Sequence, residues 1–166
     1  MAKKKTVTNA MRYLTGAKIQ YDIFEYECDE VGEHFGEEIA RLTGIECEKS
    51  FKTLVARGDK TGVITMCVPV CNEVDLKKAA KVSGNKKLDM IHVKELLSLT
   101  GYIRGGVSPI GMKKKYPTYV HKSALDFEKI AVSAGVCGCT IMLKPDDLQK
   151  VTDCIFENII KEEEGM

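Results

Sequence analysis

The segment SFKTLVAR (residues 50–57) has the alternation of a β-strand, with one lysine set into a run of apolar and small residues. Residues two apart in a strand share a face, so Lys52 points to the same side as Leu54 and Ala56. The opposite face is also largely apolar. Because burial of an ammonium is costly unless it is paired or reaches water, Lys52 is predicted either to reach solvent at the strand end or to line a pocket.

Composition predicts one folded domain. The 166 residues fall within the usual size of a single domain, and 44% hydrophobic with 30% charged residues is typical of a globular chain. We expect one domain over residues 1–166, with residues 161–166 as a solvated acidic tail. The net charge of +1 gives no overall attraction to polyanions, so DNA is not expected as a partner and any nucleic-acid contact must depend on local charge.

The sequence contains neither a membrane span nor a signal peptide. No apolar run approaches the roughly 20 residues of a membrane span, and the N-terminal MAKKKTVTNAMRYL lacks the apolar centre and cleavage site of a signal peptide. A cytoplasmic protein without a membrane partner is predicted.

Seven scattered cysteines, including Cys67-x-x-x-Cys71 and Cys137-x-Cys139, lack paired C-x-x-C spacing. They are predicted to be small buried side chains, with no metal and no other cofactor.

Hydrophobic periodicity predicts a mixed α+β fold, because strands and helices occur without strict β-α-β alternation and several strands form adjacent pairs. Thr8 and Asp75 are predicted helix N-caps, and GDKTG (residues 58–62) is a predicted hairpin turn. Strands are expected at residues 18–27, 50–57, 63–70, 118–123, 129–135 and 139–144, and helices at 9–15, 34–45, 76–84, 92–101 and 144–164.

A second notable segment is GYIRGGVSPIGMKKKYPTYVHK (residues 101–122), which is basic and contains no acidic residue. Its glycine pair Gly105–Gly106, followed by Ser108 and Pro109, allows a sharp turn and a close approach to a ligand. Free N–H groups there could hold an anion or a polarised carbonyl oxygen. A purely structural turn between strands is the alternative. The spacing does not match a dinucleotide-binding or P-loop motif.

The neighbouring Lys113, Lys114 and Lys115 indicate a rim that faces a polyanion, since lysines make sequence-independent phosphate contacts. A solvated charge run is the alternative. No nucleophilic triad is apparent, and the G-x-S-x-G motif of a serine nucleophile is missing. In addition, His34, His92 and His121 do not have the spacing of metal ligands. His121 lies in a predicted strand, where a structural role is favoured.

The motifs FKTLVA, GYIRGGVSPIGMKKKYPTYVH and IAVSAG, in this order, resemble the YbaK/EbsC family of aminoacyl-tRNA deacylases, which is similar to the editing domain inserted in bacterial prolyl-tRNA synthetases. The resemblance extends from about residue 8 to residue 160. It implies a mixed sheet rolled into a distorted barrel with flanking helices. It also implies an enzyme whose substrate is mischarged tRNA, chiefly Cys-tRNA(Pro), with prolyl-tRNA synthetase as a transient partner.

The resemblance also implies the site. Lys52 and Thr53 match its F/Y-K-T-L motif, and Lys52 would anchor the terminal ribose and phosphate or stabilise developing charge. Backbone N–H groups at Gly105 and Gly106 would face the oxyanion. In the cysteine-specific subgroup the substrate thiol attacks its own ester and leaves as a thiolactone, without an enzyme nucleophile. The other implied substrate-binding positions are Tyr26, Phe35, Ser108, Pro109, Ser133 and Thr140.

One segment departs from the subgroup. After VSAG the chain has VCGCT (residues 136–140), whereas the cysteine-specific pattern has a basic residue just before this glycine and an aspartate at Thr140. Deacylation of another small amino acid, such as Ala-tRNA(Pro), is therefore an alternative. A second alternative is a non-catalytic tRNA- or synthetase-binding module on the same fold. A nucleotide-binding regulator is a third, against which the missing P-loop pattern counts.

Overall fold

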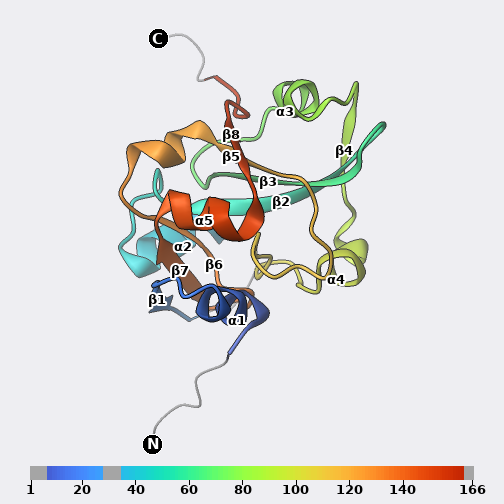
Figure 1. Ribbon diagram of the computed structural model, residues 1–166. Helices are drawn as coiled ribbons and strands as arrows, with labels where there is room; N and C mark the ends of the chain where they lie inside the picture. Colours follow the sequence, from blue (N-terminus) through green and yellow to red (C-terminus); the bar gives the residue numbers. More distant parts are fainter. Residues whose placement is uncertain (1–6, 28–34, 163–166) are drawn as a thin grey trace, which may run out of the picture.

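A computed structural model describes residues 7–27 and 35–162 of the chain (Figure 1). The predicted strand at residues 50–57 lies in the interior of the larger of its two sheets. It forms an antiparallel hairpin with the next strand, with Phe51 opposite Pro69 and Gly58 opposite Gly62. On the side of residues 51–58 the hairpin pairs with an antiparallel strand, and on the side of residues 62–69 two further strands follow, each parallel to its neighbour. In spatial order the strands are β4 (Leu88–Met90), β2 (Phe51–Gly58), β3 (Gly62–Pro69), β5 (Thr118–His121) and β8 (Ile155–Glu157).

The smaller sheet is antiparallel and has the order β1 (Asp22–Glu25), β7 (Cys139–Leu143) and β6 (Ile130–Ser133). It meets the larger sheet just before β2, where Ser50 forms an isolated bridge with Ala131 and the N–H of Ala131 donates to the carbonyl of Lys49 at 2.8 Å. The expected distorted barrel is not closed. The physical reason is that β6 ends the smaller sheet and reaches the larger one through this bridge instead of a full ladder.

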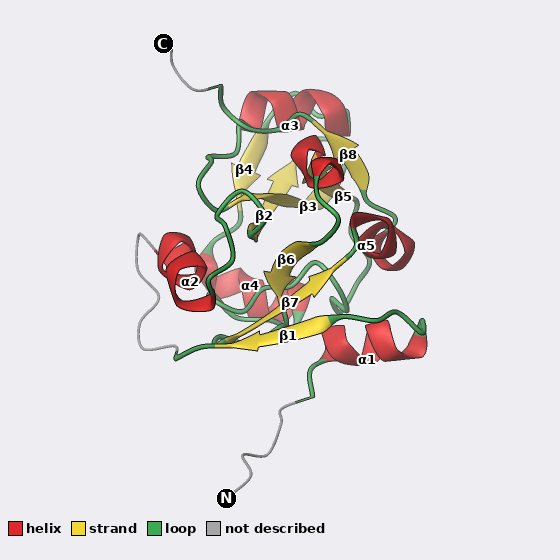
Figure 2. Cartoon of the chain, turned by 90° about the vertical axis from the view of Figure 1, so that its left-hand side faces the viewer, coloured by secondary structure: helices red, strands yellow, loops and turns green. Residues whose placement is uncertain are grey.

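The helices surround the two sheets, and α3 and α1 lie at opposite ends of the molecule (Figures 1 and 2). Both predicted N-caps are confirmed. The hydroxyl of Thr8 accepts from the N–H of Met11 at 3.2 Å, and a carboxylate oxygen of Asp75 accepts from the first-turn N–H groups. None of the helices in the described residues is long and apolar enough to cross a membrane. Their bounds are α1 (Asn9–Gly16), α2 (Phe35–Thr43), α3 (Leu76–Ser83) and α4 (Val93–Thr100), with a 3₁₀ turn at Lys122–Asp126.

The prediction of one long C-terminal helix is wrong. Helix α5 (Pro145–Thr152) begins at the predicted proline but ends at Thr152, and the next residue, Asp153, has a left-handed φ of 55°. The chain then forms β8, parallel to β5. Ile155, expected on the apolar stripe of the helix, is 49% exposed. As a strand, this segment pairs with the edge of β5, whose backbone N–H and C=O groups a continued helix would leave unpaired.

One hydrophobic cluster packs the smaller sheet, the larger sheet and helices α1 and α5 together. Leu14 of α1, Val120 of β5, Ile141 of β7 and Leu148 of α5 belong to the same packed cluster, and each is fully buried. His121, beside this core, is also buried, and its Nδ1 accepts from the N–H of Ile159 at 3.3 Å. The structural role predicted for His121 is confirmed. Burial lowers its pKa, as do the nearby Lys122 and Lys78.

The side chain of Asn85 holds the β2–β3 turn against the end of α3. Its oxygen accepts from the N–H groups of Lys60 (2.9 Å) and Thr61 (3.0 Å), and its Nδ2 donates to the hydroxyls of Thr61 and Ser83, each at 2.9 Å. Because Asn85→Ala removes four hydrogen bonds made by one buried side chain, we expect it to lower the free energy of unfolding by about 3 kcal/mol. Urea denaturation measures this.

Two variants make the test of Asn85 specific. Asn85→Asp keeps the acceptor oxygen for both backbone N–H groups and should retain part of the lost stability. Lys86→Ala changes an exposed side chain in the same loop and should shift the free energy of unfolding by no more than about 0.5 kcal/mol. An Asn85→Ala protein as stable as the Lys86→Ala protein would show that this network contributes little.

Candidate functional site

A cavity of about 600 Å³ opens where the two sheets meet, at the start of β2. Lys52 and Thr53 of β2 line it, and both are half-buried. Of the two positions that the sequence allowed for Lys52, the structure therefore shows the pocket-lining one. The wall around it contains apolar side chains such as Leu54 and Val55. An ammonium in such surroundings interacts more strongly with an anionic ligand than it would in water.

The smaller sheet supplies another part of the wall. Ser133 of β6 and Thr140 of β7 are directly paired across the ladder, and both line the cavity. Tyr26 follows β1 and is fixed by its N–H, which donates to the carbonyl of Gly138 at 2.9 Å. Burial raises the pKa of Tyr26, while hydrogen bonds with Gly138 and with the side chain of Thr140 oppose this shift. Tyr26 and Thr140 thus form a neutral, hydrogen-bonding surface.

The glycine loop reaches the cavity through Gly105. Gly105 has a φ of 91°, a left-handed conformation that favours glycine. Within the described part of the chain, its N–H has no hydrogen-bond partner. The N–H of Gly106 instead donates to the carbonyl of Ile103 at 2.9 Å. Of the two N–H groups that the sequence predicted as oxyanion donors, the one of Gly106 closes the turn, and the one of Gly105 is left to donate to a ligand.

Gly106 has a packing role that sequence reasoning did not identify. A Cβ atom at this position would lie 2.9 Å from the backbone nitrogen of Cys137 and 2.9 Å from the Cα of Val136. These are backbone atoms, which cannot rotate away as a side chain could. Gly106 therefore allows the glycine loop to lie directly against the β6–β7 connection, which brings Gly105 and the Ser133–Thr140 pair to one cavity.

Several predicted site residues lie outside this cavity. Ser108 and Pro109 are buried and do not line it, and the Ser108 hydroxyl accepts from the N–H of Ile110 at 3.3 Å. The side chain of Phe35 lies outside the described part of the chain. The triple lysine is exposed and does not line the cavity. Within it, Lys115 forms an ion pair with Asp153.

The structure adds residues that the sequence analysis did not assign to the site. Arg104, next to the glycine pair, and Asn72, after β3, both line the cavity. Arg104 is a positive charge at the edge of a wall that also contains Lys52. Its adjacency to Gly105 was a signal that could have identified it, whereas no motif in the sequence around Asn72 marks it as a site residue.

The cysteines differ in their environments. Cys67, Cys139 and Cys154 are buried, as predicted for small apolar side chains. Cys137 is disulfide-bonded, so the expectation of a small buried thiol is wrong for Cys137. Cys71 is exposed, so the expectation is wrong for Cys71 also, and its thiol lies close to Cys47 and Glu48. The Cys71 thiol, burial and the Glu48 carboxylate together raise the pKa of Cys47 to about 12.

Comparison with known proteins identifies the class of this fold and site. A family model described as "Aminoacyl-tRNA editing domain" matches residues 32–151. The chain belongs to this family. It is 47% identical over 166 residues, covering 98% of this chain and 100% of the relative, to the Enterococcus faecalis (strain ATCC 700802 / V583) protein named "Putative Cys-tRNA(Pro)/Cys-tRNA(Cys) deacylase EbsC".

Two solved structures share the fold at low sequence identity. One is described as "a putative trans-editing enzyme for prolyl tRNA synthetase", with a TM-score of 0.76, 22% identity, and coverage of 95% of this chain and 100% of that chain. The other, "hypothetical protein APE2540", has a TM-score of 0.82, 17% identity, and coverage of 93% and 100%. These likenesses confirm the mixed α/β fold expected from the sequence.

Proposed function

We propose that this protein is an aminoacyl-tRNA deacylase that removes cysteine from mischarged Cys-tRNA(Pro). The observation that supports it best is the convergence of Lys52 and the Gly105 loop on one cavity, in a chain 47% identical over its length to a relative named as such a deacylase. A mischarged tRNA acceptor end is thus the proposed ligand. A tRNA substrate is also consistent with the cytoplasmic location predicted from the sequence.

The proposed chemistry needs no nucleophile from the enzyme. The substrate thiol loses its proton, its sulfur attacks the ester carbonyl carbon, and the bond from that carbon to the ribose oxygen breaks. The ribose oxygen takes up a proton, and cysteine leaves as a thiolactone. An ester is already activated, so orientation and stabilisation of the oxyanion can supply much of the acceleration.

The cavity residues have distinct roles in this proposal. The ammonium of Lys52 holds the terminal ribose–phosphate end and offsets negative charge that develops on the oxyanion. The N–H of Gly105 donates to that oxyanion. Ser133, Thr140 and Tyr26 surround the small side chain of the substrate. Because hydrophobic size selection between small side chains is worth only about 1–3 kcal/mol, the substrate thiol contributes to selectivity through its own reactivity.

The direct test is deacylation of three substrates, namely Cys-tRNA(Pro), Ala-tRNA(Pro) and Pro-tRNA(Pro). We expect loss of the ester from Cys-tRNA(Pro), with a thiolactone as the first product, and little loss from the other two. Faster loss from Ala-tRNA(Pro) would instead establish the alternative substrate. Binding of tRNA without loss of any ester would identify a non-catalytic module. Addition of prolyl-tRNA synthetase to the assay tests whether the enzyme acts in a ternary complex.

The triple lysine is proposed to contact the tRNA backbone outside the cavity. Lys114 is exposed, and the described residues include no ion-pair partner for it, whereas Lys115 is paired with Asp153. We expect Lys114→Ala to weaken tRNA binding and to reduce the slope of log affinity against log salt concentration by about 1. Lys115→Ala should have a smaller effect. Equal slopes in both variants and the parent protein would contradict a phosphate contact.

A further inference from the structure

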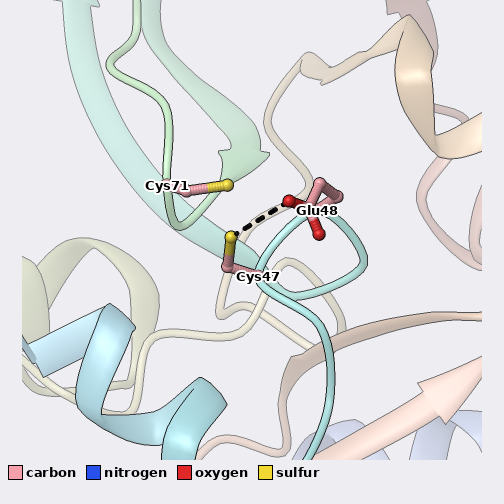
Figure 3. Close-up of side chains that lie close together, drawn as sticks. All are labelled: Cys47, Glu48 and Cys71. Carbon is pink, nitrogen blue, oxygen red and sulfur yellow. Dashed lines mark hydrogen bonds between the residues drawn. The ribbon is translucent and has the colours of Figure 1, made fainter.

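Cys47, Glu48 and Cys71 gather beside the cavity although the two cysteines are distant in sequence (Figure 3). Cys47 and Glu48 precede β2, and Cys71 follows β3. Because β2 and β3 are antiparallel, the segment entering the one and the segment leaving the other lie at the same end of the hairpin. The N–H of Val70 donates to the carbonyl of Ser50 at 2.8 Å and fixes the two segments to each other.

We propose that this cluster is a binding site for a thiophilic divalent cation of the zinc type, with two cysteine sulfurs and one carboxylate oxygen as ligands. The three donor atoms all lie within 4.8 Å of one another, and the Cys47 sulfur is 3.5 Å from Oε1 of Glu48. Zn–S bonds of about 2.3 Å and Zn–O bonds of about 2.0–2.2 Å in a tetrahedron separate neighbouring ligand atoms by about 3.5–3.8 Å. To reach these separations, no two of the donor atoms have to approach each other by more than about 1.3 Å.

The donor set also suits such an ion chemically. Sulfur ligands favour zinc and other soft cations over magnesium or calcium. Glu48 and Cys71 are exposed, so the ion can enter from solvent and a water molecule can complete a four-coordinate shell. Sequence analysis did not find this site, because Cys47-Glu48 and Cys71 come from separate segments and do not have C-x-x-C spacing.

Local charge supports the same conclusion. Among the described residues, no lysine or arginine forms a salt bridge with Glu48. The adjacent Lys49 pairs instead with Glu46, at 3.8 Å, and its ammonium lies 5.7 Å from the centre of the Phe127 ring. On binding, the two thiols would release their protons to solvent, and the divalent cation would offset two of the three negative charges of the thiolates and the carboxylate. Since Cys71 also lines the cavity, the ion would lie at the edge of the candidate functional site.

The test is metal titration of the full chain, reduced with a phosphine and stripped with a chelator. We expect Zn²⁺ to bind with one equivalent at this site, and Co²⁺ to give the intense sulfur-to-cobalt charge-transfer absorption of thiolate ligation. Cys47→Ser and Cys71→Ser should each lower the affinity for Zn²⁺ by about 100-fold or more, and Glu48→Gln by about 10-fold. Loss of metal affinity in the variants is independent of deacylase activity, so this test stands or fails separately from the proposed function.

Two matched variants control for charge and for thiol count. Glu46→Gln removes an exposed carboxylate two residues away, and Cys154→Ala removes a buried thiol outside the cluster. Both should bind Zn²⁺ like the parent protein. The Glu48→Gln change lies on an exposed side chain, so it reports on metal binding even if a cysteine variant folds poorly. Equal affinities in parent and cluster variants, or a cobalt spectrum without sulfur charge transfer, would overturn the proposal. So would a reduced chain that binds no metal and only forms a Cys47–Cys71 disulfide on oxidation.

Discussion

Replacement of Lys52 by alanine is expected to lower kcat/KM for deacylation of Cys-tRNA(Pro) by about 10²- to 10³-fold, which is the effect of removing one group that stabilises an oxyanion. Lys52 lines the cavity from an interior strand, so its ammonium is positioned by the sheet and not by a mobile loop. No other lysine lines this cavity among the described residues. Single-turnover deacylation of purified Cys-tRNA(Pro) measures the effect.

Two variants separate the role of Lys52 from general charge and from folding. Lys49→Ala removes a cation three residues earlier that pairs with Glu46 outside the cavity, and it should leave kcat/KM within a few-fold of the parent value. Lys52→Arg keeps the charge and should retain more activity than Lys52→Ala. Circular dichroism should show that both Lys52 variants are folded. Near-parental turnover by a folded Lys52→Ala protein would remove this residue from the mechanism.

Replacement of Gly106 by alanine is expected to lower kcat/KM by about 10²-fold, although Gly106 does not line the cavity. The added Cβ atom would lie 2.9 Å from backbone atoms of Val136 and Cys137, so the glycine loop or the β6–β7 connection must shift. A shift approaching 1 Å is enough for a loss of this size when it displaces a group that orients the reaction. The displaced group here is the N–H of Gly105.

The matched control for Gly106 is Gly16→Ala. Gly16 ends α1, and an added Cβ would meet no atom within 4 Å. This variant should keep both its melting temperature and its activity. For Gly106→Ala we expect a large loss of kcat/KM with only a small decrease in melting temperature, because the clash affects the loop and not the core. A Gly106→Ala enzyme with full activity would show that the loop tolerates the displacement.

The departure of this chain from the cysteine-specific pattern is physically coherent. Thr140 is 4% exposed, so an aspartate in its place would be a buried charge that requires a cationic partner. This chain has Cys137 where the pattern has a basic residue before Gly138. Both members of the charge pair are therefore replaced by uncharged groups, and Tyr26 and Thr140 instead hydrogen-bond with each other. This part of the cavity is neutral.

Local sequence signals predicted the regular elements well. The caps at Thr8 and Asp75, the β2–β3 hairpin and the position of the proline at the start of α5 depend on contacts within a few residues. Such contacts are encoded in adjacent side chains, so periodicity and capping rules detect them. The C-terminal strand was missed because β8 depends on pairing with β5, more than thirty residues earlier. An apolar spacing that suits a helix is overridden when a sheet edge is available.

The site divides in the same way. By itself, the sequence established that Lys52 is an ammonium on a largely apolar strand and that the chain can turn sharply at Gly105 and Gly106. Only the tertiary structure decided that Lys52 faces a cavity, that Gly105 retains the donor while Gly106 packs against a backbone, and that Cys47 and Cys71 lie together. The physical reason is that these relations depend on how the two sheets meet beside β2. That meeting is set by the packing of one core over distant segments, and no local pattern of residues contains it.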